Sequence, residues 1–171
     1  EDLAFPFVYP QEYDWLLKTT KEHYEDWDIY VKRVKPLLAE ELTREGVRFL
    51  DINARAKHYY SLYKKLLKYD MDISKINDVS ALRVIIPTIE DCYATLGVIH
   101  KLWRPLPGKI KDYIALPKPN GYRSLHTTVF GPEERPVEIQ MRTPEMHEEA
   151  EHGIAAHWAY SEFKRHNTPG Y

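Results

Sequence analysis

Residues 81–86 read Ala-Leu-Arg-Val-Ile-Ile, and Pro87 follows them directly. Branched apolar residues favour the pleated, half-buried surface of a sheet, whereas proline cannot donate a hydrogen bond to a neighbouring strand. The pattern therefore predicts a short, buried strand that ends at Pro87.

The segments around this strand alternate between strand-like and helix-like patterns. Before it, apolar residues recur at helical spacing, and Pro36 is expected to kink or split the long N-terminal helix. This order of elements predicts an α+β fold, in which a mixed sheet carries helices packed on it. We predict helices over residues 11–45, 55–67, 90–101 and 144–163, strands over 110–116, 124–130 and 137–142, and an extended segment over 5–10.

The composition is that of an ordinary soluble globular domain. The chain has 171 residues, of which 43% are hydrophobic and 29% charged, and this length fits one domain. No apolar run approaches the ~20 residues of a membrane span, and nothing at the start signals export. Cys92 is the only cysteine, which rules out an internal disulfide and a cysteine metal cluster. We expect a cytoplasmic protein without membrane contacts, with Cys92 in its core.

Charge is distributed unevenly along the chain, although the formal net charge is only -2. Residues 55–68 carry several basic side chains and no acid, whereas acids dominate residues 133–151. Two basic segments in a nearly neutral chain suit a small polyanion in a cleft better than a long nucleic acid. We therefore expect no direct nucleic-acid binding.

The second basic segment, residues 108–128, combines cations with an aromatic ring and a tight turn. Pro119, Asn120 and Gly121 form the turn, which presents Tyr122 beside the cations. Cations next to an aromatic ring can hold phosphates and stack a base, so the segment predicts a nucleotide phosphate site. A solvated basic hairpin is the alternative. The basic residues are Lys109, Lys111, Lys118 and Arg123, against the single acid Asp112.

Any phosphates would have to be held by side chains, because the sequence contains neither a P-loop nor a Rossmann glycine turn. The first basic segment can supply such side chains on a helix, where three- and four-residue spacing brings them together. A solvated helix face is the alternative. The residues concerned are Arg55, Lys57, Ser61, Lys64 and Lys65.

Two carboxylates accompany predicted strands. Asp78 precedes the strand at residues 81–86, and alternation along residues 137–142 puts Glu138, Gln140 and Arg142 on one face. A carboxylate pair on adjacent strands can hold Mg²⁺, which keeps substrate phosphates among its ligands. The alternatives are a turn residue for Asp78 and an exposed strand position paired with a lysine for Glu138.

The histidines near the C-terminus do not match a zinc site. His147 and His152 are five residues apart, which places them about 140° apart around a helix. Capping or core packing is the better interpretation. A serine hydrolase is similarly disfavoured, because Ser124 and His126 lie two apart on a predicted strand without a nucleophile turn.

Five segments in order resemble the synthetase domain of the RelA/SpoT family, in its long multidomain form. The resemblance covers nearly the whole chain and implies one catalytic domain over residues 1–171, excised from a longer protein, with an N-terminal helical region at 1–50 and a catalytic core at 51–163. The segments are RAKHYYSLYKK at 55–65, NDVSALRV at 77–84, the basic run at 109–128, EIQMRT at 138–143 and GIAAHWAY at 153–160.

The resemblance implies a nucleotidyltransferase-like mixed sheet flanked by helices. It also implies a GTP/GDP diphosphokinase of the stringent response, which transfers pyrophosphate from ATP to the 3′-hydroxyl of GDP or GTP with Mg²⁺ and releases AMP. The ribosome and tRNA would be partners only through domains absent from this chain.

The family's functional residues correspond to positions present in this sequence. Asp78 and Glu138 would bind Mg²⁺, and Glu138 would also activate the hydroxyl. Lys109 stands where bifunctional members have arginine and keeps the charge without the bidentate fork, so the acceptor preference is left open. By the same resemblance, ATP would be held by Arg55, Lys57, Ser61, Lys65 and Arg83, and the acceptor by Lys109, Lys111, Lys118, Asn120, Tyr122 and His126.

Two other classes of function remain open. One is a nucleotide- or alarmone-binding regulatory module that has lost catalysis, although both carboxylates and the phosphate-contacting positions are present. The other is a general RNA-binding domain, for which binding to oligonucleotides would weaken steeply with salt.

Overall fold

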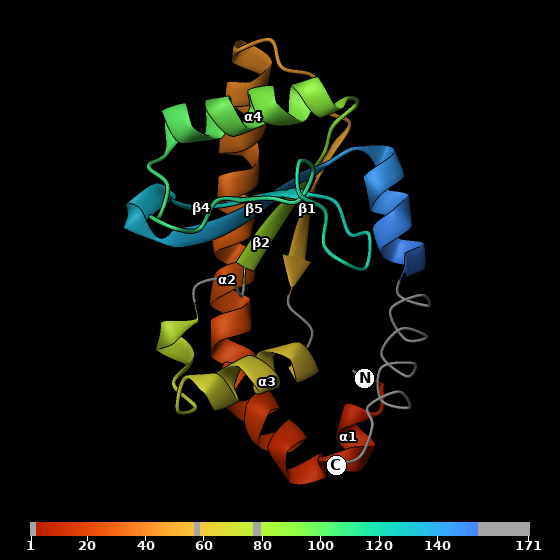
Figure 1. Cartoon of the computed structure of the whole chain (residues 1–171). Helices are drawn as coiled ribbons and strands as arrows, with labels where there is room; N and C mark the ends of the chain where they lie inside the picture. Colours follow the sequence, from red (N-terminus) through yellow and green to blue (C-terminus); the bar gives the residue numbers. More distant parts are fainter. Residues whose placement is uncertain (1–2, 57–58, 77–79, 154–171) are drawn as a thin grey trace.

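The computed structural model describes residues 3–56, 59–76 and 80–153. Within them, a five-stranded mixed sheet lies between helices (Figure 1), so the predicted α+β class is confirmed. Residues 144–153 form a further helix after the last strand. The labelled elements are α1 (Phe5–Val8), α2 (Pro10–Arg44), β1 (Asp51–Ala56), α3 (Tyr59–Lys68), η1 (Ile73–Lys75), β2 (Ser80–Ile85), α4 (Ile89–Leu102), β3 (Lys111–Asp112), β4 (Leu125–Phe130), η2 (Pro132–Glu134) and β5 (Pro136–Arg142).

The strands are arranged in the order β1-β2-β5-β4-β3. β2 and β5 are parallel neighbours, and the other pairs are antiparallel. The predicted strand at residues 81–86 is therefore a central one, with a partner on each side. Its apolar character follows from this position, because a central strand covered by helices is withdrawn from water.

Alternation gives the sheet one apolar face and one polar face. α2 and α4 pack on the apolar face, which includes Leu82, Val84 and Ile139. Cys92 is buried in the same core, as expected, and burial raises the pKa of its thiol to about 12. The opposite face carries Arg83, Glu138, Gln140 and Arg142, whose side chains alternate with the core residues along β2 and β5.

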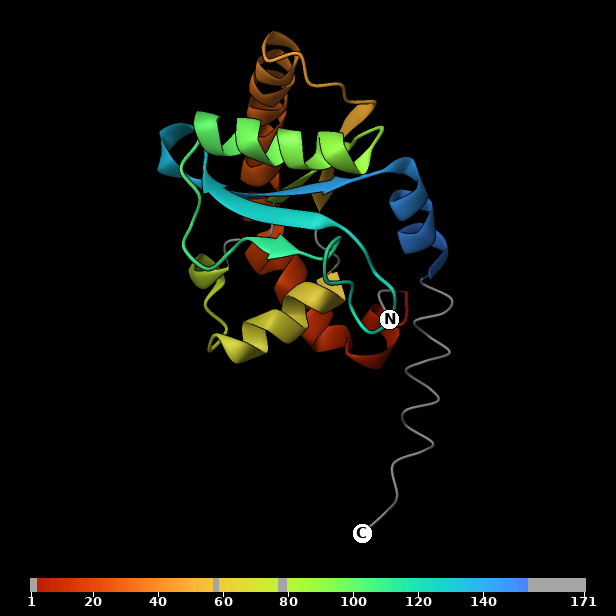
Figure 2. The ribbon, with the colours of Figure 1, turned by 45° about the horizontal axis from the view of Figure 1, so that its top comes forward.

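A second, smaller core joins α1, α3 and the N-terminal half of α2. Phe5, Leu16, Leu62, Leu66 and Ile76 are buried there and are surrounded by tyrosines and Trp27. Figures 1 and 2 show α3 on the side of the sheet opposite to α4. The polar face of the sheet therefore lies opposite this second core.

α2 is continuous over its 35 residues and contributes to both cores. Leu16 lies in the smaller core, and Val34 and Leu38 lie in the core against the sheet. Pro36 lies inside the helix without dividing it, so the expected split does not occur. None of the helices in the described part of the chain has the length and apolar character needed to cross a membrane.

Several local signals explain where elements begin and end. The hydroxyl of Thr88 accepts a hydrogen bond from the backbone N–H of Asp91 and caps α4. After α3 the chain reverses through Asp70 and Met71, which both have positive φ. Asp72 then caps η1 by accepting from Ser74.

The sequence-based assignment of the N-terminal half was wrong in two places. Residues 5–8 form the short helix α1 rather than an extended segment, with Pro6 in the first turn, where its missing N–H costs nothing. Residues 51–56 form β1, so Arg55 lies on a strand and the predicted helix over 55–67 begins later, as α3 at Tyr59. Pairing with β2 along the whole of β1 decides this outcome.

The remaining predictions are closer to the structure. β2, α4, β4 and β5 lie where expected, and β3 pairs with β4 but is only two residues long. The helix predicted over residues 144–163 is observed as far as residue 153, and the rest of it lies outside the described residues.

Tyr30 connects α2 to the loop between β4 and β5. Its hydroxyl lies 3.0 Å from the carbonyl oxygens of both Pro132 and Arg135, and the Arg135 guanidinium lies 4.2 Å from its ring centroid. A Cβ atom at Gly131 would lie 2.5 Å from the Tyr30 hydroxyl oxygen. The glycine is therefore required by the close approach of the tyrosine.

We expect Gly131→Ala to lower the free energy of unfolding by about 1–3 kcal/mol, as overpacking typically does. The cost should be smaller in a Tyr30→Phe background, because the clashing oxygen is then absent. Denaturant unfolding of the two single variants and the double variant measures this coupling. Strictly additive effects would show that Gly131 is not constrained by Tyr30.

Candidate active site

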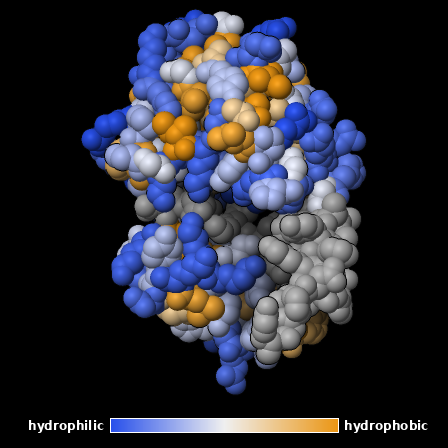
Figure 3. Space-filling view, viewed as in Figure 1, coloured by the Kyte–Doolittle hydropathy of each residue, from blue (hydrophilic) through white to orange (hydrophobic). Residues whose placement is uncertain are grey.

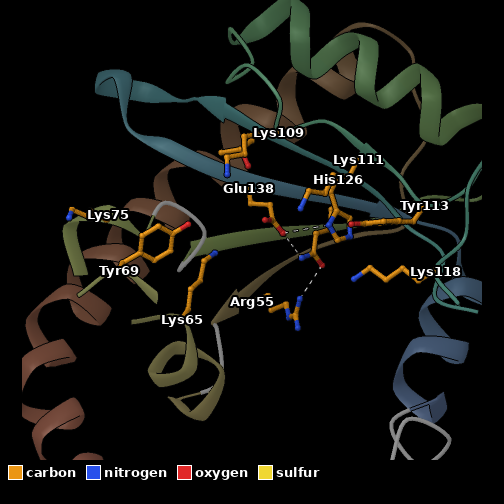
Figure 4. Close-up of a pocket in the computed structure, with 12 residues that line it drawn as sticks. Arg55, Lys65, Tyr69, Lys75, Lys109, Lys111, Tyr113, Lys118, His126 and Glu138 are labelled. Carbon is orange, nitrogen blue, oxygen red and sulfur yellow. Dashed lines mark hydrogen bonds and ion pairs between the residues drawn. The ribbon is translucent and has the colours of Figure 1, made fainter. Parts of the chain in front are cut away.

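A pocket of about 310 Å³ lies between the polar face of the sheet and the segment from α3 to η1. The space-filling view shows the molecule hollowed between its upper and lower parts (Figure 3). In the close-up, Tyr69 and Lys75 lie at one end of the pocket, Tyr113 and Lys118 at the other, and Glu138 between them (Figure 4). The lining consists of Arg55, Lys65, Tyr69, Lys75, Lys109, Lys111, Tyr113, Lys118, His126, Thr128, Glu138 and Gln140.

The pocket is strongly cationic. Glu138 is the one acid among its described lining residues. Clefts lined mainly by one sign of charge concentrate ions of the opposite sign, so this pocket is suited to a polyanion. The cations are Arg55, Lys65, Lys75, Lys109, Lys111 and Lys118.

Strand register brings residues distant in sequence into two rows across the polar face. Arg55 pairs with Ala81, which pairs with Glu138, which pairs with Thr128. One step along, the second row reads Asn53, Arg83, Gln140, His126 and Lys111. The sheet therefore places the carboxylate of Glu138 between cations contributed by separate strands.

On β5, the predicted alternation of Glu138, Gln140 and Arg142 is confirmed as a chain of hydrogen bonds. The Gln140 amide nitrogen donates to a Glu138 carboxylate oxygen at 2.6 Å, and Arg142 donates to the Gln140 carbonyl at 3.4 Å. Arg55 on β1 donates to the same carbonyl, also at 3.4 Å. Arg142 is buried, which lowers its pKa to about 10 and leaves it charged at neutral pH.

Tyr122 and His126 form an aromatic cluster with Tyr113 at one end of the pocket. The Tyr122 hydroxyl lies 2.9 Å from His126 Nε2, and Tyr113 packs edge-on against both rings. The Lys118 ammonium lies 4.7 Å from the Tyr113 ring centroid and 5.2 Å from that of Tyr122. The segment at 108–128 therefore brings together cations and aromatic rings, as its sequence predicted.

Burial, with the nearby Lys118 and Arg142, lowers the pKa of His126 to about 3. His126 is therefore neutral at physiological pH. The 3.9 Å approach between its Nδ1 and a Glu138 oxygen is consequently a dipolar contact rather than an ion pair. A neutral imidazole has one donor and one acceptor nitrogen, so it can face both Tyr122 and Glu138.

The turn before Tyr122 is confirmed. Gly121 has a φ of 82°, its N–H donates to the Lys118 carbonyl at 2.8 Å, and the Asn120 side chain accepts from the Tyr122 N–H. Asn120 therefore shapes the loop, in addition to any contact with a ligand that the resemblance implies.

Asp112 does not face the pocket. Its carboxylate accepts hydrogen bonds from the Tyr93 hydroxyl at 2.7 Å and from the backbone N–H groups of Ile114 and Ala115. Burial alone would raise the pKa of Asp112, but these hydrogen bonds outweigh it, and the pKa is lowered. Asp112 thus anchors the loop to α4 and leaves Lys109 and Lys111 to determine the local potential.

The structure brings most of the predicted site residues to this pocket, with some exceptions. Ser61, on α3 four residues before Lys65, and Asn120, in the turn before Tyr122, are not among the lining residues. Arg83 is on the polar sheet face, where it lies 3.6 Å from a Glu151 oxygen, and Tyr122 contacts the lining through His126. Lys57 and Asp78 lie outside the described residues.

Five lining residues were missed as site residues by the sequence analysis: Tyr69, Lys75, Tyr113, Thr128 and Gln140. Alternation with Glu138 was a usable signal for Gln140. The sequence contains no such signal for Tyr69 and Lys75, because they reach the pocket only through the reversal of the chain after α3.

The donor set is compatible with a magnesium ion. In the described part of the lining, Glu138 is the single carboxylate, and Mg²⁺ is commonly held by one or two carboxylates together with substrate phosphates. Glu138 would therefore hold the ion with the phosphates of a nucleotide, joined by Asp78 if the predicted pair is correct.

We expect His126 to make stability depend on pH. The unfolded chain binds a proton as the pH falls below the ordinary pKa of 6.5, whereas the folded chain does so only near 3. Stability contributed by neutral His126 is therefore full above pH 6.5 and is lost as the pH falls, by about 2 kcal/mol between pH 7 and pH 5.

Denaturant unfolding of wild type and His126→Gln at these two pH values measures the effect. The variant should lose less stability on acidification, whereas His152→Gln, which removes an exposed histidine, should behave like wild type. Equal pH dependence in all three proteins would contradict the pKa assignment.

The fold agrees with comparisons to known proteins. Residues 54–165 match the family described as "Region found in RelA / SpoT proteins". The chain is 45% identical over 171 residues to a guanosine-3′,5′-bis(diphosphate) 3′-pyrophosphohydrolase of Aquifex aeolicus (strain VF5), covering 99% of the chain and 24% of that protein. It is 44% identical over 164 residues to a GTP pyrophosphokinase of Myxococcus xanthus, covering 96% of the chain and 22% of that protein.

A solved structure shares the fold. The small alarmone synthetase 2 from Bacillus subtilis superimposes with a TM-score of 0.67 at 26% identity, covering 87% of this chain and 83% of that one. The chain spans about a quarter or less of the length of the two curated relatives. The family match covers more than half of the chain, and the chain therefore belongs to the RelA/SpoT family.

Proposed function

We propose that this chain is a (p)ppGpp synthetase domain, which transfers pyrophosphate from ATP to the 3′-hydroxyl of GDP or GTP. The observation that carries the proposal is the pocket itself, whose described lining residues include six cations around one carboxylate. Two nucleotides with their phosphate chains bring a large negative charge, which such a pocket offsets. The carboxylate of Glu138 is then available for chemistry instead of charge balance.

Membership of the RelA/SpoT family supports the same function. The Myxococcus xanthus relative is named a GTP pyrophosphokinase, and the Bacillus subtilis structure is an alarmone synthetase. ATP and GTP are nucleotides of the cytoplasm, where we place the activity.

In the proposed reaction, the 3′-oxygen of the acceptor attacks the β-phosphorus of ATP. The bond from that phosphorus to the oxygen bridging to the α-phosphate breaks, and AMP leaves with this oxygen. Glu138 accepts the hydroxyl proton, a role that requires the carboxylate to lie within hydrogen-bond reach of the hydroxyl. A bound Mg²⁺ would supply charge neutralisation at the transferred phosphates.

The binding residues divide into two groups by the elements that carry them. Arg55 and Lys65, from β1 and α3, would hold ATP, with Arg83 on β2 beside the adenine. Lys57 and Ser61 are also assigned to ATP; Lys57 lies outside the described residues, and Ser61 lies on α3 four residues before Lys65. The acceptor would lie at the end of the pocket formed by Lys109, Lys111, Lys118, Asn120, Tyr122 and His126.

The Aquifex aeolicus relative is named for hydrolysis of guanosine-3′,5′-bis(diphosphate), the product of the proposed reaction. A pocket that binds the acceptor can also bind this compound. Hydrolysis of added ppGpp is therefore the second activity to measure.

The deciding experiment incubates the chain with Mg²⁺, GDP or GTP, and ATP labelled in the γ-phosphate. Label appearing in ppGpp or pppGpp together with an equal amount of AMP supports the proposal. Nucleotide binding without AMP release would indicate a regulatory module. Salt-sensitive binding of oligonucleotides without transfer would indicate an RNA-binding domain.

Glu138→Gln should abolish transfer and leave the fold intact. A neutral amide of similar shape neither attracts Mg²⁺ nor accepts the hydroxyl proton, so the loss should exceed the ~10²–10⁴-fold typical of acid–base catalysis alone. Product formation at saturating Mg²⁺ and thermal unfolding are the measurements. A variant that keeps a tenth of the wild-type rate would remove Glu138 from the mechanism.

Tyr122→Ala should weaken the binding of the guanine nucleotide by roughly 1–3 kcal/mol, the usual cost of deleting a stacking ring. Tyr122→Phe is the matched control, since it keeps the ring and loses only the hydroxyl near His126. Calorimetry with GDP and with ATP distinguishes the two sites. ATP affinity that falls while GDP affinity stays constant would show that the sites are assigned in reverse.

A further inference from the structure

Gln140 is the most highly connected polar side chain next to Glu138. It is 3% exposed and lies on the same face of β5, with hydrogen bonds to Glu138, Arg142 and Arg55. Neither the sequence motifs nor the proposed reaction assigns it a role. A buried amide that makes three such contacts fixes the positions of its neighbours as well as its own.

Charge determines which way the Gln140 amide points. A carboxylate only accepts hydrogen bonds and a guanidinium only donates them. The amide nitrogen must therefore face Glu138, and the carbonyl oxygen must face Arg142 and Arg55. The opposite orientation would place oxygen against oxygen at 2.6 Å and N–H groups against N–H groups.

Arg142 stabilises this orientation of the Gln140 amide. It is 1% exposed, and its guanidinium reaches the Gln140 carbonyl at 3.4 Å. Because a buried guanidinium strongly requires acceptors, rotating the amide away from it would be costly. The direction of hydrogen bonding along β5 is therefore fixed from Arg142 through Gln140 to Glu138.

The consequence concerns the two oxygens of Glu138. Oε1 accepts from Gln140 at 2.6 Å and is the oxygen approached by His126 at 3.9 Å. In the described part of the chain, Oε2 has no hydrogen-bond partner. One oxygen is thus held by the protein, and the other is left for the reacting groups.

We propose that Gln140 is a positioning residue, which holds Glu138 Oε1 so that Oε2 is presented to the acceptor hydroxyl. This inference rests on the proposed function, because it assigns the base role to Glu138. Gln140 itself touches neither substrate in this scheme and acts only through the carboxylate. A displacement of about 1 Å at a reacting group can cost on the order of 10²-fold in rate, which sets the scale of the effect.

Two substitutions separate positioning from structural support. Gln140→Leu removes both the donor to Glu138 and the acceptor for the arginines, without adding charge. Gln140→Glu removes the donor but keeps oxygen acceptors for Arg142 and Arg55. A structural role depends on the acceptor, whereas a positioning role depends on the donor.

The measurements are kcat at saturating substrates and Mg²⁺, KM for the acceptor, and the thermal unfolding midpoint. For Gln140→Leu we expect kcat to fall about 10- to 100-fold with the acceptor KM within about twofold of wild type, and a lower unfolding midpoint. For Gln140→Glu the buried Arg142 gains a counter-charge, whereas Glu138 faces a like charge in place of its donor. We therefore expect an unfolding midpoint close to that of wild type and a kcat that falls by at least a similar factor.

Activity that follows stability would overturn the proposal. One such result is a wild-type kcat in Gln140→Glu together with a lower kcat in Gln140→Leu. The other is a wild-type kcat in both variants. Met141→Leu is the control on the same strand, since Met141 is buried in the opposite face. It should change the unfolding midpoint modestly and leave kcat unchanged.

The wild-type protein distinguishes this proposal from the proposed function. If wild type forms no labelled product, the function fails before any variant is compared. If wild type is active and the variants behave as structural substitutions, the function stands and only the role of Gln140 is lost.

Discussion

The position of α2 determines where the pocket can form. One continuous helix of 35 residues contributes Leu16 to the smaller core and Val34 and Leu38 to the core against the sheet. Because the two cores share this helix, the α3 segment is held opposite the polar face of the sheet without filling the space between them. Burying apolar surface contributes roughly 25 cal/mol per Å². The two apolar cores therefore stabilise the arrangement that leaves the polar pocket open, although contacts within the pocket do not.

The charges in that gap oppose folding when no ligand is bound. Six cations among the described residues line the pocket, and the partly buried Arg83 and the buried Arg142 keep N–H groups that have no hydrogen-bond partner there. Burial lowers the pKa of both guanidiniums, which reflects the cost of desolvating them. Sites that bind charged ligands commonly carry such unsatisfied groups, because the ligand supplies the missing acceptors.

The sequence was most informative where local rules and tertiary structure agree. Alternation along residues 137–142 placed Glu138, Gln140 and Arg142 together, and the Pro-Asn-Gly turn placed Tyr122 beside its cations. It was misleading where pairing overrides local pattern. Arg55 belongs to a polar strand whose partner, β2, lies some 25 residues further along the chain. Because the basic residues continue from this strand into α3, the sequence suggested a single helix. Tyr69 and Lys75 depend on a chain reversal that residue types alone do not specify. The roles of Lys57 and Asp78 stay predictions from the resemblance.

The shared carbonyl of Gln140 connects the two halves of the proposed site. Arg55, which we assign to ATP, donates to it from β1, and Arg142 donates to it from β5. If Arg55 turns toward adenine when ATP binds, Gln140 loses one of its two donors. Arg142 cannot leave in the same way, because it is buried and next to the Tyr122 ring. Arg142 therefore holds the Gln140 amide toward Glu138 through one nitrogen, Nη2, whereas its Nε and Nη1 have no partner among the described residues.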